Sequence, residues 1–161
     1  MAMLLALLAL TALAEPVEIK DGRGYTMTVD LPADTSAKAA PIAVATMVMG
    51  PPTDGFQPNI NVQLQASTDG GGLAVFVTTT KGQFTAGGLT LVADKQKKLN
   101  GKPAWYFEYS GNMQGRSLHW TALAVEQNPN QILLVTATST EATWATNKKW
   151  LTDGINSVSV D

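Results

Sequence analysis

The sequence contains no cysteine, and this absence removes several kinds of chemistry at once. Disulfide bonds, thiol nucleophiles and thiolate metal sites all require cysteine, as does lipid attachment to a cysteine behind an export leader. Histidine occurs once, at position 119, whereas zinc needs several nitrogen or sulfur ligands. We therefore expect no cofactor and identify no metal ligand set, although carboxylates leave calcium open.

Charge is scarce and evenly spread. The chain has 11 basic and 13 acidic residues among 161, which gives a formal net charge of −2. Such a balance favours neither nucleic acid nor an anionic membrane surface, so we expect no nucleic-acid partner and leave peripheral membrane contact open. The one basic cluster is best explained as a solvated strand end and turn. It consists of Lys95, Lys97, Lys98 and Lys102.

The longest apolar stretch lies at the start of the chain. Residues 1–14 carry no charged side chain and end Ala12-Leu13-Ala14. A helix needs about 20 apolar residues to span a bilayer, whereas small residues at −1 and −3 behind a shorter run are typical of an export signal. We predict a signal peptide at 1–14, a single domain at 15–161, and a periplasmic or secreted protein. Because no basic residue precedes Lys20, an N-terminal helix is the alternative.

The first half of the remaining chain reads as strands followed by a helix. Alternating apolar residues predict half-buried strands at 25–31 and 59–65. Residues 42–49 are apolar on both faces, which predicts a central strand covered on both sides. Apolar residues at i, i+3, i+4 and i+7 predict a helix over 73–84.

From residue 89 the pattern indicates a meander of antiparallel strands. Strands are expected at 89–99, 102–110, 116–126 and 132–138. Asn100-Gly101 is a strong signal for a two-residue hairpin turn, and a second turn is expected over 111–115. A sheet whose strands are apolar on both faces needs cover on both faces, so helices should pack against it.

A helix should close the chain. Thr140 can cap it, with Glu141 in its first turn. Its buried face is expected to comprise Trp144, Leu151, Ile155 and Val158. Lys148 and Lys149 would then lie on its outer side.

Few residues qualify as chemical sites. His119 lacks a companion motif, so a strand residue facing solvent or a helix is favoured over catalysis. Residues 69–72, Asp-Gly-Gly-Gly before a helix, lack the rest of a phosphate-binding loop, so they read as a flexible connection rather than a phosphate cradle. Glu108 and Asp153 appear as isolated acids, and no acid–base pair can be assigned.

Two groups of residues form the candidate ligand or partner surface. Trp105, Phe107 and Trp120 are strand aromatics that either belong to the core or line a ligand platform. Lys148 and Lys149 would present charge to a partner from the closing helix. No catalytic, cofactor-binding or metal-binding residue is predicted.

Several short motifs, taken in order, resemble the PsbP-like superfamily and its bacterial DcrB-like members. They are Gly24-Tyr25, Asp30-Leu31-Pro32, Phe56–Val62, Leu99–Ala104, Trp150-Leu151 and Ile155–Val158. The resemblance implies an α-β-α sandwich, a central antiparallel sheet flanked by helices. It also implies a non-enzymatic role, because the members share a binding surface rather than a reaction. Asn59 and Asn61 match the family motif, and structural roles are expected for both.

The expected function is therefore that of an exported, non-catalytic binding or accessory domain. Its partner would be another protein of the cell envelope. The alternative is a small-molecule or lipid-binding module with a pocket between sheet and helix, and an enzyme comes third. A packed core with an exposed apolar patch would favour the first, whereas a deep apolar pocket would favour the second.

Overall fold

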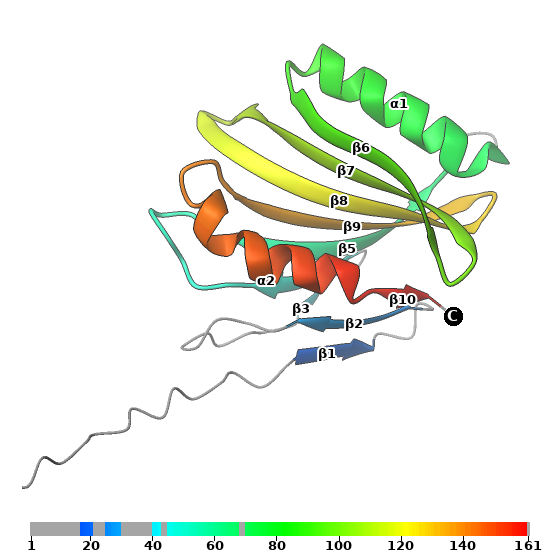
Figure 1. The fold of residues 1–161 in the computed structure, drawn as a ribbon, viewed down its shortest axis with the longest axis horizontal. Helices are drawn as coiled ribbons and strands as arrows, with labels where there is room; N and C mark the ends of the chain where they lie inside the picture. Colours follow the sequence, from blue (N-terminus) through cyan, green and yellow to red (C-terminus); the bar gives the residue numbers. More distant parts are fainter. Residues whose placement is uncertain (1–16, 21–24, 30–39, 43–44, 68–69, 161) are drawn as a thin grey trace, which may run out of the picture.

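The computed structural model describes residues 17–20, 25–29, 40–42, 45–67 and 70–160 (Figure 1). The predicted signal peptide, residues 1–14, lies outside the described residues, as does Leu31 at the end of the first expected strand.

A seven-stranded antiparallel sheet forms the centre of the fold, with the strand order β3-β4-β5-β9-β8-β7-β6. Its strands are β3 (Ala40–Ile42), β4 (Ala45–Met49), β5 (Asn59–Ala66), β6 (Thr90–Leu99), β7 (Lys102–Met113), β8 (Arg116–Asn128) and β9 (Gln131–Thr140). The last four are consecutive in sequence, and they form the predicted meander.

A smaller three-stranded sheet joins the two ends of the described chain. It contains β1 (Val17–Lys20), β2 (Tyr25–Val29) and β10 (Ser159–Val160), with β2 in the middle. Ser157 fastens the ends together, because its hydroxyl donates to the Thr28 carbonyl at 2.6 Å and accepts from the Thr28 amide at 2.9 Å. The C-terminal strand β10 thus lies beside β2 (Figure 1).

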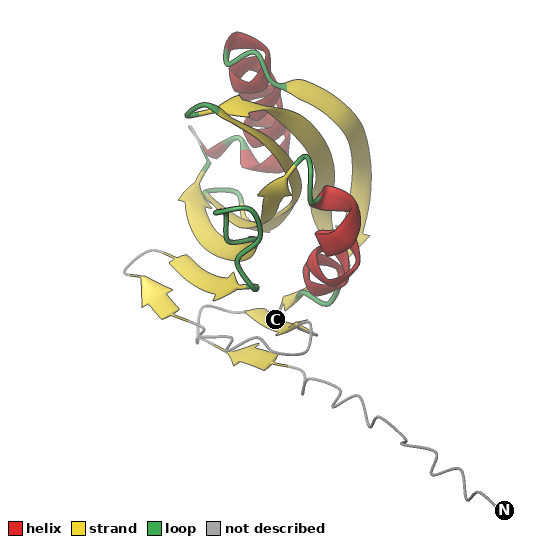
Figure 2. Cartoon of the chain, turned by 90° about the vertical axis from the view of Figure 1, so that its left-hand side faces the viewer, coloured by secondary structure: helices red, strands yellow, loops and turns green. Residues whose placement is uncertain are grey.

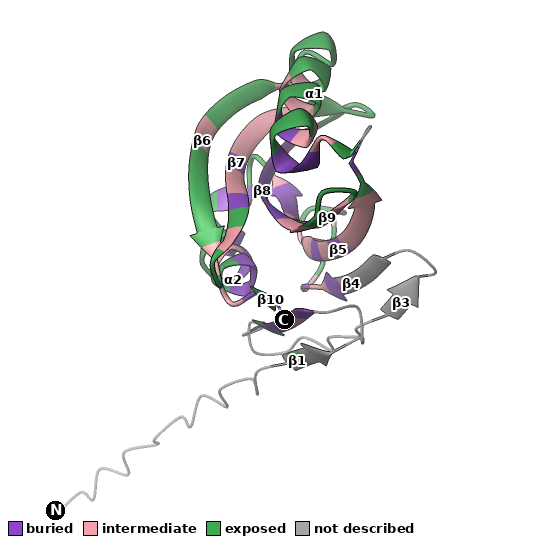
Figure 3. Cartoon of the chain, turned by 90° about the vertical axis from the view of Figure 1, so that its right-hand side faces the viewer, coloured by how far each residue is buried: buried purple, intermediate pink, exposed green. Residues whose placement is uncertain are grey.

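Two helices pack against the large sheet from different sides (Figure 2). Ala122 and Ala124 of β8 share a buried cluster with Leu73 and Val77 of α1 (Gly72–Ala86). Residues Leu123 and Val125, which alternate with those alanines, share the other cluster with Leu151 and Ile155 of α2 (Trp144–Asn156). Because successive strand residues point to opposite faces, each helix covers its own face. β8 is accordingly buried along most of its length (Figure 3).

The backbone of α2 packs closely against β5 at Gly154. A Cβ added at Gly154 would lie 2.5 Å from the Ile60 Cδ1 atom and 3.5 Å from a Val29 methyl. Ile60 and Val29 are themselves fully buried. Glycine therefore lets the helix backbone reach both the large sheet and β2.

The prediction of a mixed α+β fold with an antiparallel sheet and two helices is confirmed. The strands expected at 25–31 and 59–65 and the helix expected at 73–84 are present as β2, β5 and α1. The single central strand expected over 42–49 is wrong. Ile42 ends β3 and Ala45 begins β4, and the two strands pair with each other in antiparallel orientation. A continuous apolar run carries no signal that it belongs to two strands.

The first two turns of the meander lie at Asn100-Gly101 and Gln114-Gly115, where the backbone has positive φ angles. Asn100 and Gly101 have φ angles of 49° and 81°, which confirms the predicted hairpin turn. The turn expected over 111–115 is shorter, because β7 continues to Met113. Only Gln114 and Gly115, with φ angles of 53° and 79°, turn the chain.

The closing helix begins later than the sequence suggests. Thr140 is the last residue of β9, Glu141 precedes the helix, and the first helical residue is Trp144. The Thr140 hydroxyl accepts from the Thr143 amide at 3.2 Å, so it orders the connection rather than the helix end. The predicted buried residues, Trp144, Leu151, Ile155 and Val158, are all buried, although Val158 lies beyond the helix. Lys148 and Lys149 are exposed, as predicted.

Candidate functional site

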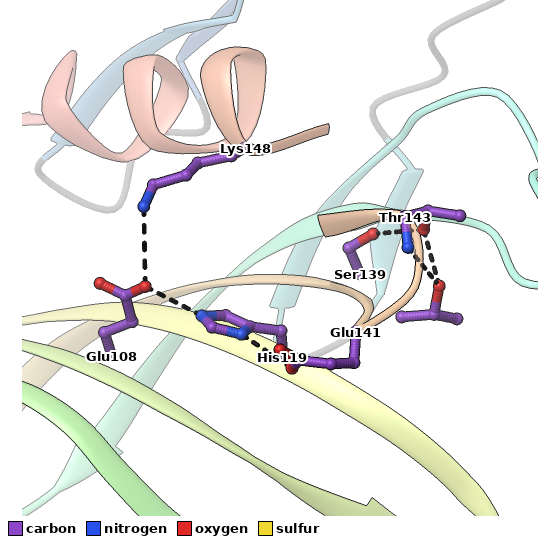
Figure 4. A network of polar contacts seen from close by, with 7 residues as sticks. Glu108, His119, Ser139, Glu141, Thr143 and Lys148 are labelled. Atoms are coloured by element: carbon purple, nitrogen blue, oxygen red, sulfur yellow. Dashed lines mark hydrogen bonds and ion pairs between the residues drawn. The ribbon is translucent and has the colours of Figure 1, made fainter. Parts of the chain in front are cut away.

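The sole histidine lies between two carboxylates under the start of α2 (Figure 4). His119 Nδ1 is 2.9 Å from Glu141 Oε2, and His119 Nε2 is 3.0 Å from Glu108 Oε1. Trp144 stacks on the imidazole, with ring centroids 4.0 Å apart and planes 17° apart. The side chain of His119 is only 7% exposed. The sequence analysis expected His119 to face either solvent or a helix, and the structure shows that it faces a helix.

Three separate parts of the chain build this cluster. His119 belongs to β8, and it faces α2 because it is in phase with Thr121, Leu123 and Val125. Glu108 lies opposite Thr121 on the neighbouring β7. Glu141 comes from the short connection between β9 and α2. Strand pairing and the delayed helix start together bring these residues into contact.

Glu108 has further partners, so its interpretation as an isolated acid is wrong. Lys148 Nζ of α2 lies 3.8 Å from Glu108 Oε1. Burial, followed by the charge of Glu108 and a hydrogen bond to it, raises the pKa of Tyr106 to about 12. Asp153 is not isolated either, since Lys149 Nζ donates to its Oδ2 at 2.6 Å.

Proton count limits what the cluster can do. A neutral imidazole has one N–H donor, whereas an ionised carboxylate only accepts. Both contacts of His119 are hydrogen bonds only when the cluster holds one additional proton, on the imidazole or on a glutamate. We call the set Glu108, His119, Glu141 and Lys148 the His119 cluster. Its contacts join β7, β8 and α2, which suits it to holding the helix on the sheet.

The hydroxyl of Ser139, which lies opposite His119 on β9, is engaged elsewhere. Ser139 Oγ is 2.9 Å from Thr143 Oγ1 and accepts from Asn147 Nδ2 at 3.1 Å. Asn147 in turn accepts from Trp150 Nε1 at 3.2 Å. This chain of hydrogen bonds fixes the first two turns of α2. Among the described residues, no group of three or more His, Asp or Glu side chains is placed to hold a metal ion.

The predicted aromatic surface is largely interior. Phe107 and Trp120 are buried on the α1 face of the sheet, and Trp105 is half-buried there. Trp105 Nε1 donates to Asp94, and Lys81 of α1 contacts the same carboxylate. Lys148 and Lys149 belong to α2 on the other face. The candidate residues therefore lie on opposite faces of the sheet, the aromatic side chains on the α1 face and the two lysines on α2.

A cavity of about 160 Å³ lies between α1 and the sheet. Of the candidate residues, only Phe107 lines it; the other aromatic walls are Phe76 and Phe84 of α1 and Tyr109 of β7. Tyr109 stacks between Phe84 and Trp120, at centroid distances of 4.2 and 5.0 Å. The sequence suggested a pocket between sheet and helix only as an alternative, and apart from Phe107 it did not predict the residues that line this one. The alternating aromatics of β7 and the two phenylalanines of α1 were its only sequence signals.

The glycine-rich start of α1 already holds a carboxylate of the chain itself. Leu73 N donates to Glu126 Oε2 at 2.7 Å, and Gly72 N donates to the Pro129 carbonyl at 3.0 Å. A helix N-terminus favours negative charge, and Glu126 supplies it here. This contact supports a structural connection rather than a phosphate cradle.

Comparison with solved structures shows a PsbP-like fold. The chain is similar to LpqN of Mycobacterium tuberculosis, a protein involved in cell envelope biogenesis. The TM-score is 0.63 at 15% identity, covering 91% of this chain and 90% of that one. It is similar to the cyanobacterial PsbP, CyanoP, from Synechocystis sp. PCC 6803, with a TM-score of 0.58 at 15% identity and coverage of 98% and 99%. The Ran-binding protein Mog1p of Saccharomyces cerevisiae gives 0.55 at 12% identity, with coverage of 91% and 96%.

The family follows from the sequence itself. The DcrB family model matches residues 27–157, and the chain belongs to this family. No curated protein matches. Among the described residues, no helix is long and apolar enough to cross a membrane.

Proposed function

We propose that this protein is an exported, non-catalytic domain that binds another protein of the cell envelope. The observation that carries the proposal is the match to the DcrB family over most of the chain. The similarity to LpqN, a protein named for cell envelope biogenesis, supports the same location. We also infer that the two helices and the sheet form the α-β-α sandwich that the PsbP-like resemblance implies.

The outer side of α2 is the surface that we assign to the partner. The side chains of Lys148 and Lys149 are 53% and 91% exposed. The helix that carries both lysines is held on the sheet by polar contacts. Asn147 bonds Ser139 of β9, and the His119 cluster links the helix to β7 and β8. A rigid helix that presents two cations suits a partner with an acidic surface, because complementary charge guides association and orientation.

Capture from envelope extract tests this assignment. The tagged mature chain, residues 15–161, should enrich one protein, and the double variant Lys148→Gln/Lys149→Gln should lose most of that enrichment. The matched control is Lys97→Gln/Lys98→Gln, which removes the same charge from exposed positions of β6. Equal capture by both double variants would refute the α2 surface. No enrichment over the tag alone would refute the partner itself.

Export makes a separate prediction. If residues 1–14 are a signal peptide, the protein isolated from its native envelope should begin at Glu15, because Ala12 and Ala14 fit the cleavage rule. Intact mass measurement and N-terminal peptide mapping check this. An abundant native form that retains Met1 would contradict export by cleavage.

The second candidate function is a small-molecule or lipid-binding module. The cavity beneath α1 favours it, because aromatic side chains wall that space. In both candidates the domain is not an enzyme. This is supported by a histidine that is enclosed under α2 and by a nearby serine whose hydroxyl contacts Thr143 and Asn147.

A further inference from the structure

The space between α1 and the sheet is large enough for one six-membered ring. Its volume of about 160 Å³ is close to that of engineered apolar cavities, about 150 Å³, that bind benzene. Four aromatic side chains wall it, namely Phe76, Phe84, Phe107 and Tyr109. Aromatic walls prefer edge-to-face and offset contacts with another ring. An aromatic occupant therefore gains contacts that an aliphatic one of the same size does not.

A second, more polar hollow continues from this cavity. It has a volume of about 150 Å³, and it shares Gln65, Phe76, Thr80 and Gln83 with the first. Its remaining walls include Ala66 and Thr79, both exposed, so it opens towards solvent. A ligand in the inner cavity would thus have amide and hydroxyl groups at its outer end.

No charge lines either hollow. Neither contains an acidic or basic side chain among its lining residues. The one titratable group is Tyr109, and burial raises its pKa to about 12, so its hydroxyl stays neutral. Bringing an ionised ligand into such a site would cost its hydration without a counter-charge.

We propose that this cavity binds a small neutral aromatic molecule carrying one hydrogen-bonding group. The ring lies among Phe76, Phe84 and Phe107, and the polar group points to Gln65, Gln83 or Thr80. The site is on the opposite face from the lysines of α2. It therefore does not depend on the protein partner, and partner capture can fail while this site binds its ligand.

Titration with 4-methylphenol, followed by protein-observed NMR, tests the site. The expected result is saturable shifts confined to α1, β7 and the adjoining parts of β5, β8 and β9, which together line the cavity. The charged analogue 4-methylbenzoate should bind at least about tenfold more weakly, a difference of about 1.4 kcal/mol. Absence of saturable shifts with 4-methylphenol would overturn the proposal, as would equal binding of the two compounds.

A matched pair of variants on α1 locates the binding. Thr80→Phe extends a ring into the space from the helix, and it should weaken 4-methylphenol binding by about tenfold or more. Thr78→Phe places the same ring at an exposed position of α1 outside both hollows, and it should leave binding unchanged. Circular dichroism confirms that each variant is folded. If the folded Thr80→Phe variant binds as well as the native protein, the proposal is wrong.

Discussion

Replacing Trp144 with alanine should lower the free energy of unfolding by about 3–5 kcal/mol, the usual cost of emptying a large buried site. Trp144 is only 8% exposed, and it opens α2. Its ring stacks on His119 at 4.0 Å. The substitution removes apolar contact and also uncovers a polar cluster that the indole shields from water. Urea unfolding measured at one pH gives the difference directly.

Lys149→Ala is the matched control on the same helix. Its side chain is 91% exposed, and surface substitutions usually change stability by no more than about 0.5 kcal/mol. The contrast between the two variants measures how far α2 seals its face of the sheet. If Trp144→Ala is as mild as Lys149→Ala, the buried cluster beneath α2 does not depend on this side chain.

Local patterns in the sequence were sufficient to predict most of the secondary structure. The alternation of Ile60 and Val62 with amides required a strand with one buried face, and β5 has it. The apolar spacing from Leu73 onward outweighed the β-branched run at 77–80, because packing on β8 and β9 stabilises α1 against its propensity. These elements are set by residues close in sequence.

Contacts between distant residues were beyond such reasoning. Glu108 and Glu141 are 11 and 22 positions from His119; in the sequence Glu108 looked isolated, and Glu141 was assigned to the first turn of the closing helix. Their meeting depends on the register that places Glu108 opposite Thr121, which no local pattern specifies. The same limit explains why Thr140 and Glu141 were taken for a helix start. Instead, the Thr140 hydroxyl bonds Thr143 within the connection, and the Glu141 carboxylate contacts His119 of β8.

The cavity beneath α1 shows a third kind of limit. The sequence indicated that aromatic residues of β7 lie on one face, and Trp105, Phe107 and Tyr109 do. Whether such residues fill the space or enclose a cavity depends on how closely α1 approaches. Phe84 stacks on Tyr109, yet the helix leaves a gap beside them. The volume of the cavity therefore depends on how α1 packs on the sheet, and the residue types alone do not determine it.

Replacing His119 with leucine should cost about 1–3 kcal/mol of stability, the range expected when a buried polar group loses one of its hydrogen-bond partners. Leucine can occupy much of the imidazole site against Trp144, so the loss comes mainly from polar contacts. Glu108, whose side chain is 14% exposed, loses the nearer of its two nitrogen contacts, and Lys148 Nζ lies farther away at 3.8 Å. A carboxylate left in this position keeps its contacts with Tyr106 and Lys148 but loses the imidazole, which had taken the place of water at Oε1.

A second substitution separates charge from packing. In the His119→Leu background, Glu108→Gln removes the carboxylate that has lost its imidazole partner, so the double variant should regain at least about half of the lost stability. Glu141→Gln alone should cost less than about 1 kcal/mol, because that side chain is 50% exposed and water can replace its contact. Chemical denaturation of the native protein, of the single variants His119→Leu and Glu108→Gln and of the double variant completes the cycle, with Glu141→Gln measured beside them. If the losses from His119→Leu and Glu108→Gln simply add, the two side chains act independently, and the His119 cluster is not what holds α2 on the sheet.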